Sequence, residues 1–323
     1  MVPGQLDLFG AAAPPALAAA PADPAHEALA ARLPPMLRLG TSSWSFPGWA
    51  GLLYDRAASE AALSKAGLPA YARNPLLRAV GMDRTYYAPL DAAAFALHAA
   101  QVPEGFRFLV KASQECTSPT LPTAAGGSVA NPRFLDPAWA KEAVVAPAAE
   151  GLGEKLGVLL FQFPPLTFSA SRRPEAVLER LRAFLAALPA GVPYGVELRS
   201  PALFTPAYAK LLEETGAAHS YVVHPAAPEL EAQARLLPPE AQPSLVLRWM
   251  LGHGRGYEEA RELYRPFDRL AAPDPDTREA VARICARASR LGRPGIVIVN
   301  NKAEGCSPRS VFALAERIAG EAG

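Results

Sequence analysis

The chain has 323 residues, of which 50% are hydrophobic, and its formal net charge is +1. This composition provides enough apolar area for a large core, and the balanced charge excludes overall steering toward nucleic acid or acidic membranes, although a local basic patch remains open. Three cysteines without paired spacing argue against a disulfide framework or a zinc knuckle and indicate a reducing cytoplasm.

No targeting or membrane segment is expected. The longest apolar runs are far too short to span a bilayer. The N-terminus has no basic segment before its Ala-rich part and contains several prolines, so it does not read as a signal peptide. Residues 1–34 hold 12 alanines and 6 prolines with almost no charge. Such a segment cannot bury enough area to offset its ordering entropy, so we predict a disordered tail over 1–34 and one folded domain over 35–323.

Eight short apolar or β-branched runs follow, and each has a polar or charged residue at its C-terminal end. The runs are Leu37–Ser42, Val80–Asp83, Phe106–Lys111, Gly157–Gln162, Tyr194–Glu197, Ser220–His224, Leu245–Arg248 and Ile296–Asn300. Each is followed by a stretch with a helical pattern. Eight such units predict an α/β fold, a single TIM-type (β/α) barrel of eight parallel strands.

Capping residues mark several of the expected helices. Apolar residues at helical spacing between Pro174 and Leu188 predict a helix packed against the sheet. An acidic capping box of Asp276 with Glu279 predicts another helix start. The expected N-cap and stop pairs are Thr205 with Gly216, Asp276 with Gly292, and Ser307 with Gly320.

Three strand-to-helix connections are long enough to be lids or binding loops. They are Ala112–Pro137, Pro225–Pro243 and Leu251–Tyr257. The last contains Gly252, Gly254 and Arg255, whose backbone N–H groups and charge could cradle an anion. A Gly-rich loop can equally be a flexible turn.

The strand ends bring polar side chains to one rim of the expected barrel. Because residues two apart share a face, Lys111 lies on the face of Leu109, and Glu197 on that of Arg199. The expected rim set is Asp83, Lys111, Gln162, Glu197, Arg199, Arg248, Asn300 and Asn301. Partly desolvated charges must pair with each other or with a ligand, so the set is either a structural ion-pair network or a ligand site. We favour the ligand site for the whole set, since barrel enzymes use this rim.

Two further features bear on the site. Trp44, Phe46 and Trp49 follow the first strand and could stack on a base or sugar, or could form a hydrophobic plug over the barrel. The five histidines show no clustered ligand spacing, so the sequence predicts no metal and no cofactor.

Several motifs together resemble the YecE-like proteins, domain of unknown function seventy-two, from about Met36 to the C-terminus. The motifs are Leu39-Gly40-Thr41-Ser42-Ser43-Trp44-Ser45-Phe46, Thr85-Tyr86-Tyr87, Leu109-Val110-Lys111, Phe161-Gln162-Phe163-Pro164-Pro165, Val196-Glu197-Leu198-Arg199 and Asn300-Asn301-Lys302. The resemblance implies a TIM-type barrel and no established reaction. That fold is similar to the endonuclease IV and xylose isomerase barrels, whose metal-binding His, Asp and Glu clusters are missing here.

The second strand departs from the family pattern, which usually reads Glu-x-Asn-x-Thr-Phe-Tyr. The matching positions here are Gly81, Asp83, Thr85, Tyr86 and Tyr87. The family glutamate is therefore absent, and Asp83 either takes over its polar role or marks a subgroup with a different ligand.

A second resemblance lies in the tail. Gln5-Leu6-Asp7-Leu8-Phe9 is similar to the pentapeptide with which bacterial DNA polymerases and repair proteins dock on the sliding clamp. Leu8 and Phe9 would fill an apolar pocket, Gln5 would hydrogen-bond beside it, and the tail would fold on binding. Chance occurrence in a short segment is the alternative.

These observations leave three hypotheses. In the first, a metal-independent hydrolase, lyase or isomerase acts on a small anionic or sugar-like metabolite. Its base is Glu197, its electrostatic or proton-donating partner Lys111, and its further polar group Asp83. Its ligand-binding residues are Arg199, Arg248, Asn300, Asn301 and Gln162, with Trp44 or Tyr87 stacking.

In the second hypothesis, which we favour as biological context, the tail tethers the barrel to the sliding clamp and the rim receives nucleic acid or a phosphorylated small molecule. The third is a non-catalytic binding module. The sequence leaves the substrate, the reaction and the oligomeric state open.

Overall fold

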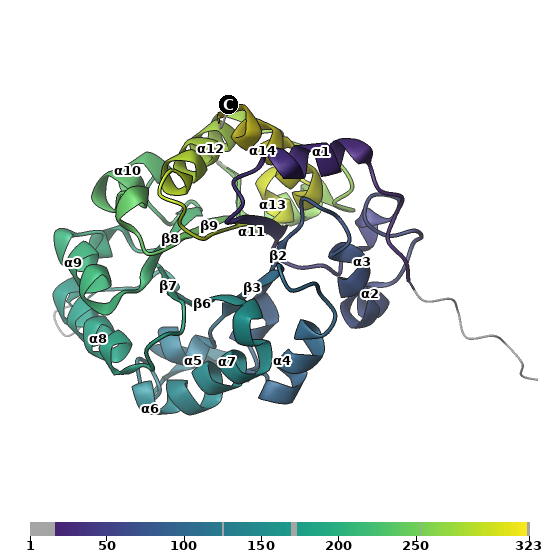
Figure 1. Cartoon of the computed structure of the whole chain (residues 1–323). Helices are drawn as coiled ribbons and strands as arrows, with labels where there is room; N and C mark the ends of the chain where they lie inside the picture. The colour runs from purple at the N-terminus through teal and green to yellow at the C-terminus, as the bar shows by residue number, and fades with distance from the viewer. Residues whose placement is uncertain (1–16, 125, 169–172, 253, 322–323) are drawn as a thin grey trace, which may run out of the picture.

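Eight parallel strands close into a barrel surrounded by helices in the computed structural model, which describes residues 17–124, 126–168, 173–252 and 254–321 (Figure 1). The barrel strands are β1 (Leu37–Thr41), β2 (Ala79–Met82), β3 (Arg107–Lys111), β6 (Leu156–Gln162), β7 (Tyr194–Glu197), β8 (Ala218–Val223), β9 (Leu245–Trp249) and β10 (Gly295–Val299). Neighbours around the barrel run β1-β10-β9-β8-β7-β6-β3-β2, and β2 pairs with β1 to close the ring.

The fold class predicted from the eight apolar runs is therefore confirmed. Each run overlaps one barrel strand, and no boundary differs by more than two residues. The polar residue at the end of each run commonly stands at the strand end or just beyond it. The pattern works because a strand that is covered on both faces must be apolar until it emerges at the rim.

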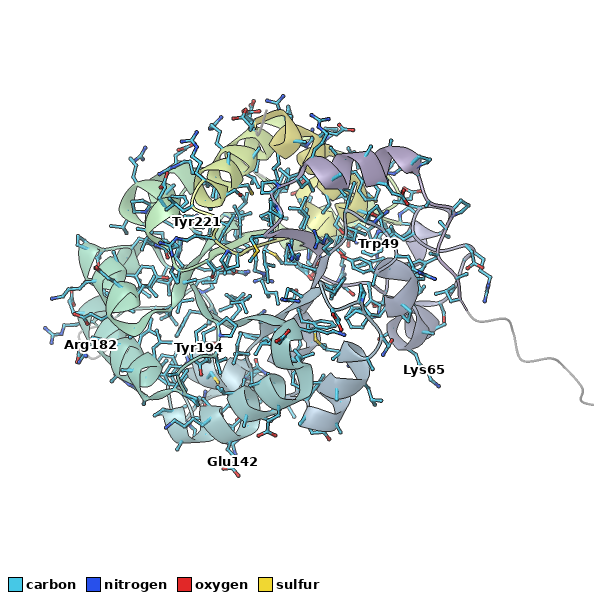
Figure 2. The ribbon with its side chains drawn as sticks, viewed as in Figure 1. Trp49, Lys65, Glu142, Arg182, Tyr194 and Tyr221 are labelled. Atoms are coloured by element: carbon cyan, nitrogen blue, oxygen red, sulfur yellow. The ribbon has the colours of Figure 1, made fainter. Side chains whose placement is uncertain are left out.

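The helices form the outer layer and carry its polar surface. They are α1 (Pro24–Arg32), α2 (Glu60–Ala66), α3 (Leu68–Tyr71), α4 (Ala92–Ala99), α5 (Gln114–Thr117), α6 (Pro137–Ala140), α7 (Ala146–Leu152), α8 (Pro174–Ala187), α9 (Pro206–Thr215), α10 (Leu230–Leu236), α11 (Tyr257–Tyr264), α12 (Pro275–Ser289), α13 (Asn301–Glu304) and α14 (Ser307–Glu321). A π-helical turn at Lys141–Val145 joins α6 to α7. Figure 2 shows Lys65, Glu142 and Arg182 pointing outward, whereas Trp49, Tyr194 and Tyr221 lie inside the ring of helices.

The amphipathic stripe between residues 174 and 188 is confirmed as α8. Its apolar residues Val177, Leu178, Leu181, Phe184 and Leu185 are all buried. Burial of this stripe, rather than intrinsic propensity, supplies most of the helix's stability.

The predicted helix ends are right in one case and wrong in two. Helix α9 begins at Pro206, and Gly216 ends it in the left-handed conformation with φ of 68°. Helix α12 is capped by Asp274, which accepts hydrogen bonds from the N–H and hydroxyl of Thr277, so the expected cap at Asp276 is wrong. Helix α14 continues through Gly320, so the expected stop there is also wrong.

The predicted disordered tail is wrong for residues 17–34, and residues 1–16 lie outside the described part of the chain. Asp23 caps α1, and Pro24 occupies its first turn. The helix packs beside α14, where the rings of His26 and Phe312 lie 4.2 Å apart. Tertiary contact with the last helix therefore compensates for an Ala-rich composition that indicates disorder when read alone.

The long connection after β3 also contains structure that the sequence pattern missed. It forms the short helix α5 and an antiparallel hairpin of β4 (Thr120–Thr123) and β5 (Gly127–Ala130). No helix in the described ranges combines the length and the apolar character needed to cross a membrane.

The barrel interior is filled by a small apolar cluster separate from the main core. Its members are Ala79, Leu109, Val158, Leu160, Ala218, Val246, Ile296 and Ile298. They come from six strands, and residues two positions further along the same face stand at the C-terminal rim. The apolar cluster is thus the floor of the candidate site.

Candidate functional site

A buried arginine organises the rim. Arg248, at the end of β9, is 1% exposed, and its two terminal nitrogens donate to two carboxylates. The Nη1 atom lies 2.8 Å from Oε2 of Glu197, and Nη2 lies 3.0 Å from Oδ1 of Asp83. A buried charge with two such partners fixes β9 against β7 and β2 at the rim.

Glu197 is enclosed by two guanidinium groups. Its side chain is 0% exposed, and its second oxygen, Oε1, accepts a hydrogen bond of 2.9 Å from Nε of Arg199. Burial by itself would raise the pKa of Glu197, but the charges of Arg248 and Arg199 outweigh burial and lower it to about 2. Both carboxylate oxygens are therefore occupied, and the group stays ionised at neutral pH.

Lys111 enters the same space from the end of β3. Its ammonium group lies 3.7 Å from the ring centroid of Tyr86, and no described carboxylate oxygen is within salt-bridge distance of it. Burial, together with Arg248 and Arg199, lowers the pKa of Lys111 to about 8, against the opposing pull of Asp83 and Glu197. The amine therefore exchanges its proton close to neutral pH, which acid–base chemistry requires.

His224, just after β8, presents a second unusual contact. Its Nδ1 accepts a hydrogen bond of 3.1 Å from the backbone N–H of Ala226, while Nη1 of Arg199 lies 3.3 Å from its Nε2. Burial and Arg199 lower the pKa of His224 to about 4, so the ring is neutral at pH 7. A guanidinium only donates, so Nε2 accepts from Arg199 in one tautomer of the neutral ring, and Nδ1 accepts from Ala226 in the other.

Gln162 completes the inner part of the rim. It stands opposite Glu197 in the β6–β7 register and is 4% exposed. Its side-chain amide has no hydrogen-bond partner in the described part of the chain, although the adjacent Phe163 N–H donates to the carbonyl of Glu197. The amide atoms are not fully enclosed, so they are accessible to water or to a ligand.

Asn300 and Asn301 separate into different environments. Asn300 caps α13 through the N–H of Lys302 and donates from Nδ2 to the hydroxyl of Ser42, 2.8 Å away. Asn301 instead accepts from both the N–H and the hydroxyl of Ser307 and thereby holds the start of α14. Asn300 thus lies at the rim, whereas Asn301 holds the helix layer.

The aromatic residues at the rim are only partly those singled out in the sequence. Trp44 is buried and donates from Nε1 to the carbonyl of Ser64, which agrees with a hydrophobic plug. Tyr87 is 75% exposed and stands edge-on to Tyr86. The ring of Tyr257 covers the ammonium of Lys302 at 4.2 Å.

Sequence reasoning therefore missed Tyr86, Tyr257, Lys302 and His224 as rim residues. A usable signal existed for three of them. Tyr86 precedes Tyr87 in a motif already noted, Lys302 follows two rim asparagines, and His224 is the polar residue that ends one of the eight apolar runs. Tyr257 had no such signal, because a helix start gives no indication of which strand end it approaches.

The Gly-rich loop after β9 is tied to the loop after β10. The N–H of Gly252 donates to the carbonyl of Lys302, and a Cβ at Gly252 would lie 2.7 Å from the carbonyl oxygen of Ala303. Arg255 forms a 3.0 Å ion pair with Glu259. One N–H and the guanidinium are thus already engaged, and the anion cradle predicted at Gly252, Gly254 and Arg255 stays a prediction.

A cavity of about 650 Å³ adjoins the rim at His224. It lies between the loops after β8 and β9 and the start of α12, and its lining includes Gly252, Glu229 and Asp276. Within residues 17–124, 126–168, 173–252 and 254–321, no three His, Cys, Asp or Glu side chains are grouped so as to hold a metal ion.

Comparisons with known proteins agree with this architecture. Residues 38–322 match the family described as "Protein of unknown function DUF72". A DUF72 family protein from Thermotoga maritima MSB8 is 22% identical with a TM-score of 0.59, and covers 87% of this chain and 98% of its own. A DUF72 family protein from Enterococcus faecalis V583 is 18% identical with a TM-score of 0.54, and covers 89% of this chain and 95% of its own.

The class of protein defined by the fold and the rim is a (β/α) barrel with a charged site at its C-terminal face. Because the family match spans most of the sequence, the chain belongs to the DUF72 family. A search of curated proteins gave no match.

Proposed function

We propose that the rim binds a small anion carrying a ring-shaped part and that Lys111 transfers a proton to or from it. The observation that carries the proposal is the position of the Lys111 amine. It lies in the barrel mouth over Tyr86, without a carboxylate in contact, and its pKa is lowered to about 8. A structural lysine would instead pair with a carboxylate.

The charge balance of the rim supports an anionic ligand. In the cluster around Glu197, Arg248, Arg199 and protonated Lys111 bring three positive charges, and Glu197 and Asp83 bring two negative ones. One positive charge is therefore left over in a partly desolvated site, where an unbalanced charge is costly. A carboxylate or phosphate group on the ligand would balance it.

The donors of Arg199 and Gln162 indicate where this anionic group would sit. The guanidinium of Arg199 stands just after β7, and the amide of Gln162 adds a further donor from the end of β6. The adjoining cavity of about 650 Å³ could hold the rest of a metabolite-sized ligand.

The tyrosines support a ring in the ligand. Tyr86 and Tyr257 each cover a lysine, and Tyr87 is largely exposed beside them. An aromatic face can stack on a sugar or a base as well as on a cation. Trp44 is not part of this proposal because its ring is buried.

The contacts also change the roles proposed from the sequence. A base must have a free lone pair, whereas both oxygens of Glu197 are held by arginines and its pKa is lowered to about 2. We therefore assign Glu197 as the fixed anion that orients Arg248 and Arg199. Lys111 becomes the acid or base, which fits a lyase or an isomerase better than a hydrolase.

The experiment that tests the binding step is an NMR titration of ¹³C-methylated lysines. The chain has only six lysines, so the Lys111 signal can be identified from the Lys111→Met variant. Addition of ribose 5-phosphate is expected to raise the pKa of Lys111, because an anion placed beside it favours the ammonium form. The exposed Lys65 is the control, and an equal response of both lysines contradicts the proposal.

The proton-transfer step is tested in D₂O with a panel of sugar phosphates and 2-oxo acids. Deuterium incorporation at carbon is expected with the wild type and not with Lys111→Met. Binding of these compounds without any incorporation would favour a non-catalytic binding module.

The role in DNA metabolism remains a separate prediction. It depends on the peptide Gln5–Phe9, which lies outside the described residues. Binding of the full-length chain to a bacterial sliding clamp, and its loss when Leu8 and Phe9 are both changed to Ala, would support a tether. Equal binding by the two chains would argue against it.

A further inference from the structure

The N-terminal opening of the barrel, opposite the rim, contains an unbalanced group of arginines. Arg38 lies in β1 in register with Ile296, which belongs to the interior apolar cluster. Arg107 lies in β3, two residues before Leu109 of the same cluster. Because alternate residues of a strand share a face, both arginines point toward the barrel axis from below.

A cavity of about 240 Å³ lies at this opening and is lined by Arg38 and Arg107. The rest of its lining is mainly apolar and includes Leu156, Leu245, Pro294 and Ile296. The opening therefore combines a cationic edge with an apolar interior.

Backbone carbonyls hold the two guanidinium groups in place. Arg38 donates from Nε to the carbonyl of Gly105 at 2.9 Å and from Nη1 to the carbonyls of Pro35 and Leu37. Arg107 donates from Nη1 to the carbonyls of Glu104 and Phe106. The Nη2 atoms of both residues make no hydrogen bond in the described part of the chain, and neither is fully buried.

No described carboxylate neutralises this group. Neither arginine forms a salt bridge within residues 17–124, 126–168, 173–252 and 254–321, and the same holds for Arg78 nearby. Nη2 of Arg78 lies 3.4 Å from the position that a Cβ on Gly105 would occupy, so Arg78 and Arg38 flank the same glycine. Burial, Arg78 and Arg107 lower the pKa of Arg38 to about 10, the direction expected for like charges held together.

We propose that the N-terminal opening of the barrel binds a small amphiphilic anion, with its anionic head at Arg38 and Arg107 and its short apolar tail in the cavity. The carbonyls fix the donors before binding, so little ordering entropy is lost on association. The head would replace the absent carboxylate, and the tail would cover Leu156, Leu245 and Ile296. A structural plug is the alternative, in which the arginines serve only their carbonyl partners.

The test compares the melting temperature of the full chain in hexanoate with that in acetate and in hexan-1-ol, all at one ionic strength. Hexanoate is expected to raise the melting temperature in a concentration-dependent way, because a ligand of the native state stabilises it by mass action. Acetate lacks the tail and hexan-1-ol lacks the charge, so both are expected to act more weakly. Equal effects of hexanoate and acetate would overturn the proposal.

Variants locate the effect. Arg107→Met is expected to abolish the response to hexanoate, whereas Arg182→Met, on the outer face of α8, is expected to keep it (Figure 2). Lys111→Met is expected to keep it as well, which separates this opening from the rim. A full response to hexanoate in Arg107→Met, or loss of the response in Lys111→Met, contradicts a site at the N-terminal opening.

Should Arg107→Met fail to fold, Arg78→Met supplies the measurement. The side chain of Arg78 makes no hydrogen bond to a carbonyl in the described structure, and the substitution keeps the backbone bond from Arg78 N–H to Leu39, so the fold is expected to be spared. Removal of one nearby positive charge is expected to weaken hexanoate binding by about fivefold in calorimetry, which corresponds to about 1 kcal/mol. Unchanged affinity would contradict the proposal.

Discussion

The two ends of this barrel use arginine in opposite ways. At the C-terminal rim, Arg248 and Arg199 meet the carboxylates of Glu197 and Asp83 in direct ion pairs. At the N-terminal opening, the described hydrogen-bond partners of the Arg38 and Arg107 side chains are all backbone carbonyls. The C-terminal rim therefore has a nearly neutralised set of ion pairs around Lys111. The N-terminal opening has positive charges without counter-ions at its edge.

The difference shows what decides the effect of a buried charge. Breaking a complete buried ion pair strongly lowers the free energy of unfolding, because the charge that remains stays desolvated without its partner. A cluster of like charges without counter-ions lowers the stability of the folded state. Only solvent or a bound ligand can offset that loss. The following predictions test that contrast, beginning with the largest expected effect.

Removal of the central carboxylate should have the largest effect. Glu197→Gln leaves Arg248 and Arg199 without their anion in a buried site, so we expect a loss of about 3–5 kcal/mol in the free energy of unfolding at pH 7. Urea denaturation measures it. Glu179→Gln, which breaks an exposed pair on α8, is the control and is expected to change nothing measurable.

Glu197 should also contribute to the loss of stability at acid pH. Its folded pKa lies below the ordinary value of 4.5, at about 2, so its stabilising contribution is present above pH 4.5 and is lost as the pH falls toward 2. The pH dependence in this window should be shallower in Glu197→Gln. An equally steep loss in the variant would show that other groups dominate.

A glycine in the loop after β10 should be the next most sensitive position. Gly305 has φ of 117°, and a Cβ there would lie 2.6 Å from the carbonyl oxygen of Arg269. Gly305→Ala is expected to cost about 1–3 kcal/mol from backbone strain alone. Gly320→Ala, where nothing lies within 4 Å, is the control and is expected to stabilise α14 by about 0.5–1 kcal/mol.

The lysine at the rim should give a smaller effect with a distinct pH profile. The folded pKa of Lys111 is lowered from 10.5 to about 8, so the unfolded chain binds more protons between these values and stability rises with pH across them. Lys111→Met lacks this term and should be more stable than the wild type below pH 8. The difference should disappear toward pH 10.5 in denaturation curves.

Lys65→Met is the matched control for that profile, since Lys65 is exposed on α2. It is expected to follow the wild type at every pH. If Lys111→Met also follows the wild type at every pH, the surroundings of Lys111 do not destabilise its charged form.

The smallest effect on stability is expected at the N-terminal opening of the barrel. Arg78→Met relieves repulsion among three half-buried arginines and should stabilise the protein by at most about 1 kcal/mol at low salt. The gain should shrink as salt screens the remaining charges. Thermal unfolding at two ionic strengths measures it, and destabilisation at low salt would show that the arginines do not repel one another.

Local sequence patterns predicted most of the fold and part of the site. Period-two alternation placed Lys111 on the inner face with Leu109, and the interior cluster confirms that position of Leu109. The predictions that failed depended on distant contacts. Residues 24–32 form a helix because α14 lies beside them, and α12 is capped two residues before the expected position.

The sequence by itself determined the order and spacing of eight strands and the identity of the polar residues that end them, because strand period and burial are local properties. Only the tertiary structure decided which charges meet. It holds Glu197 between two arginines, leaves Lys111 over an aromatic ring, and gathers Arg38 and Arg107 at the opposite opening. Closure of the barrel sets these distances, and ionisation depends on distance and burial rather than on position along the chain.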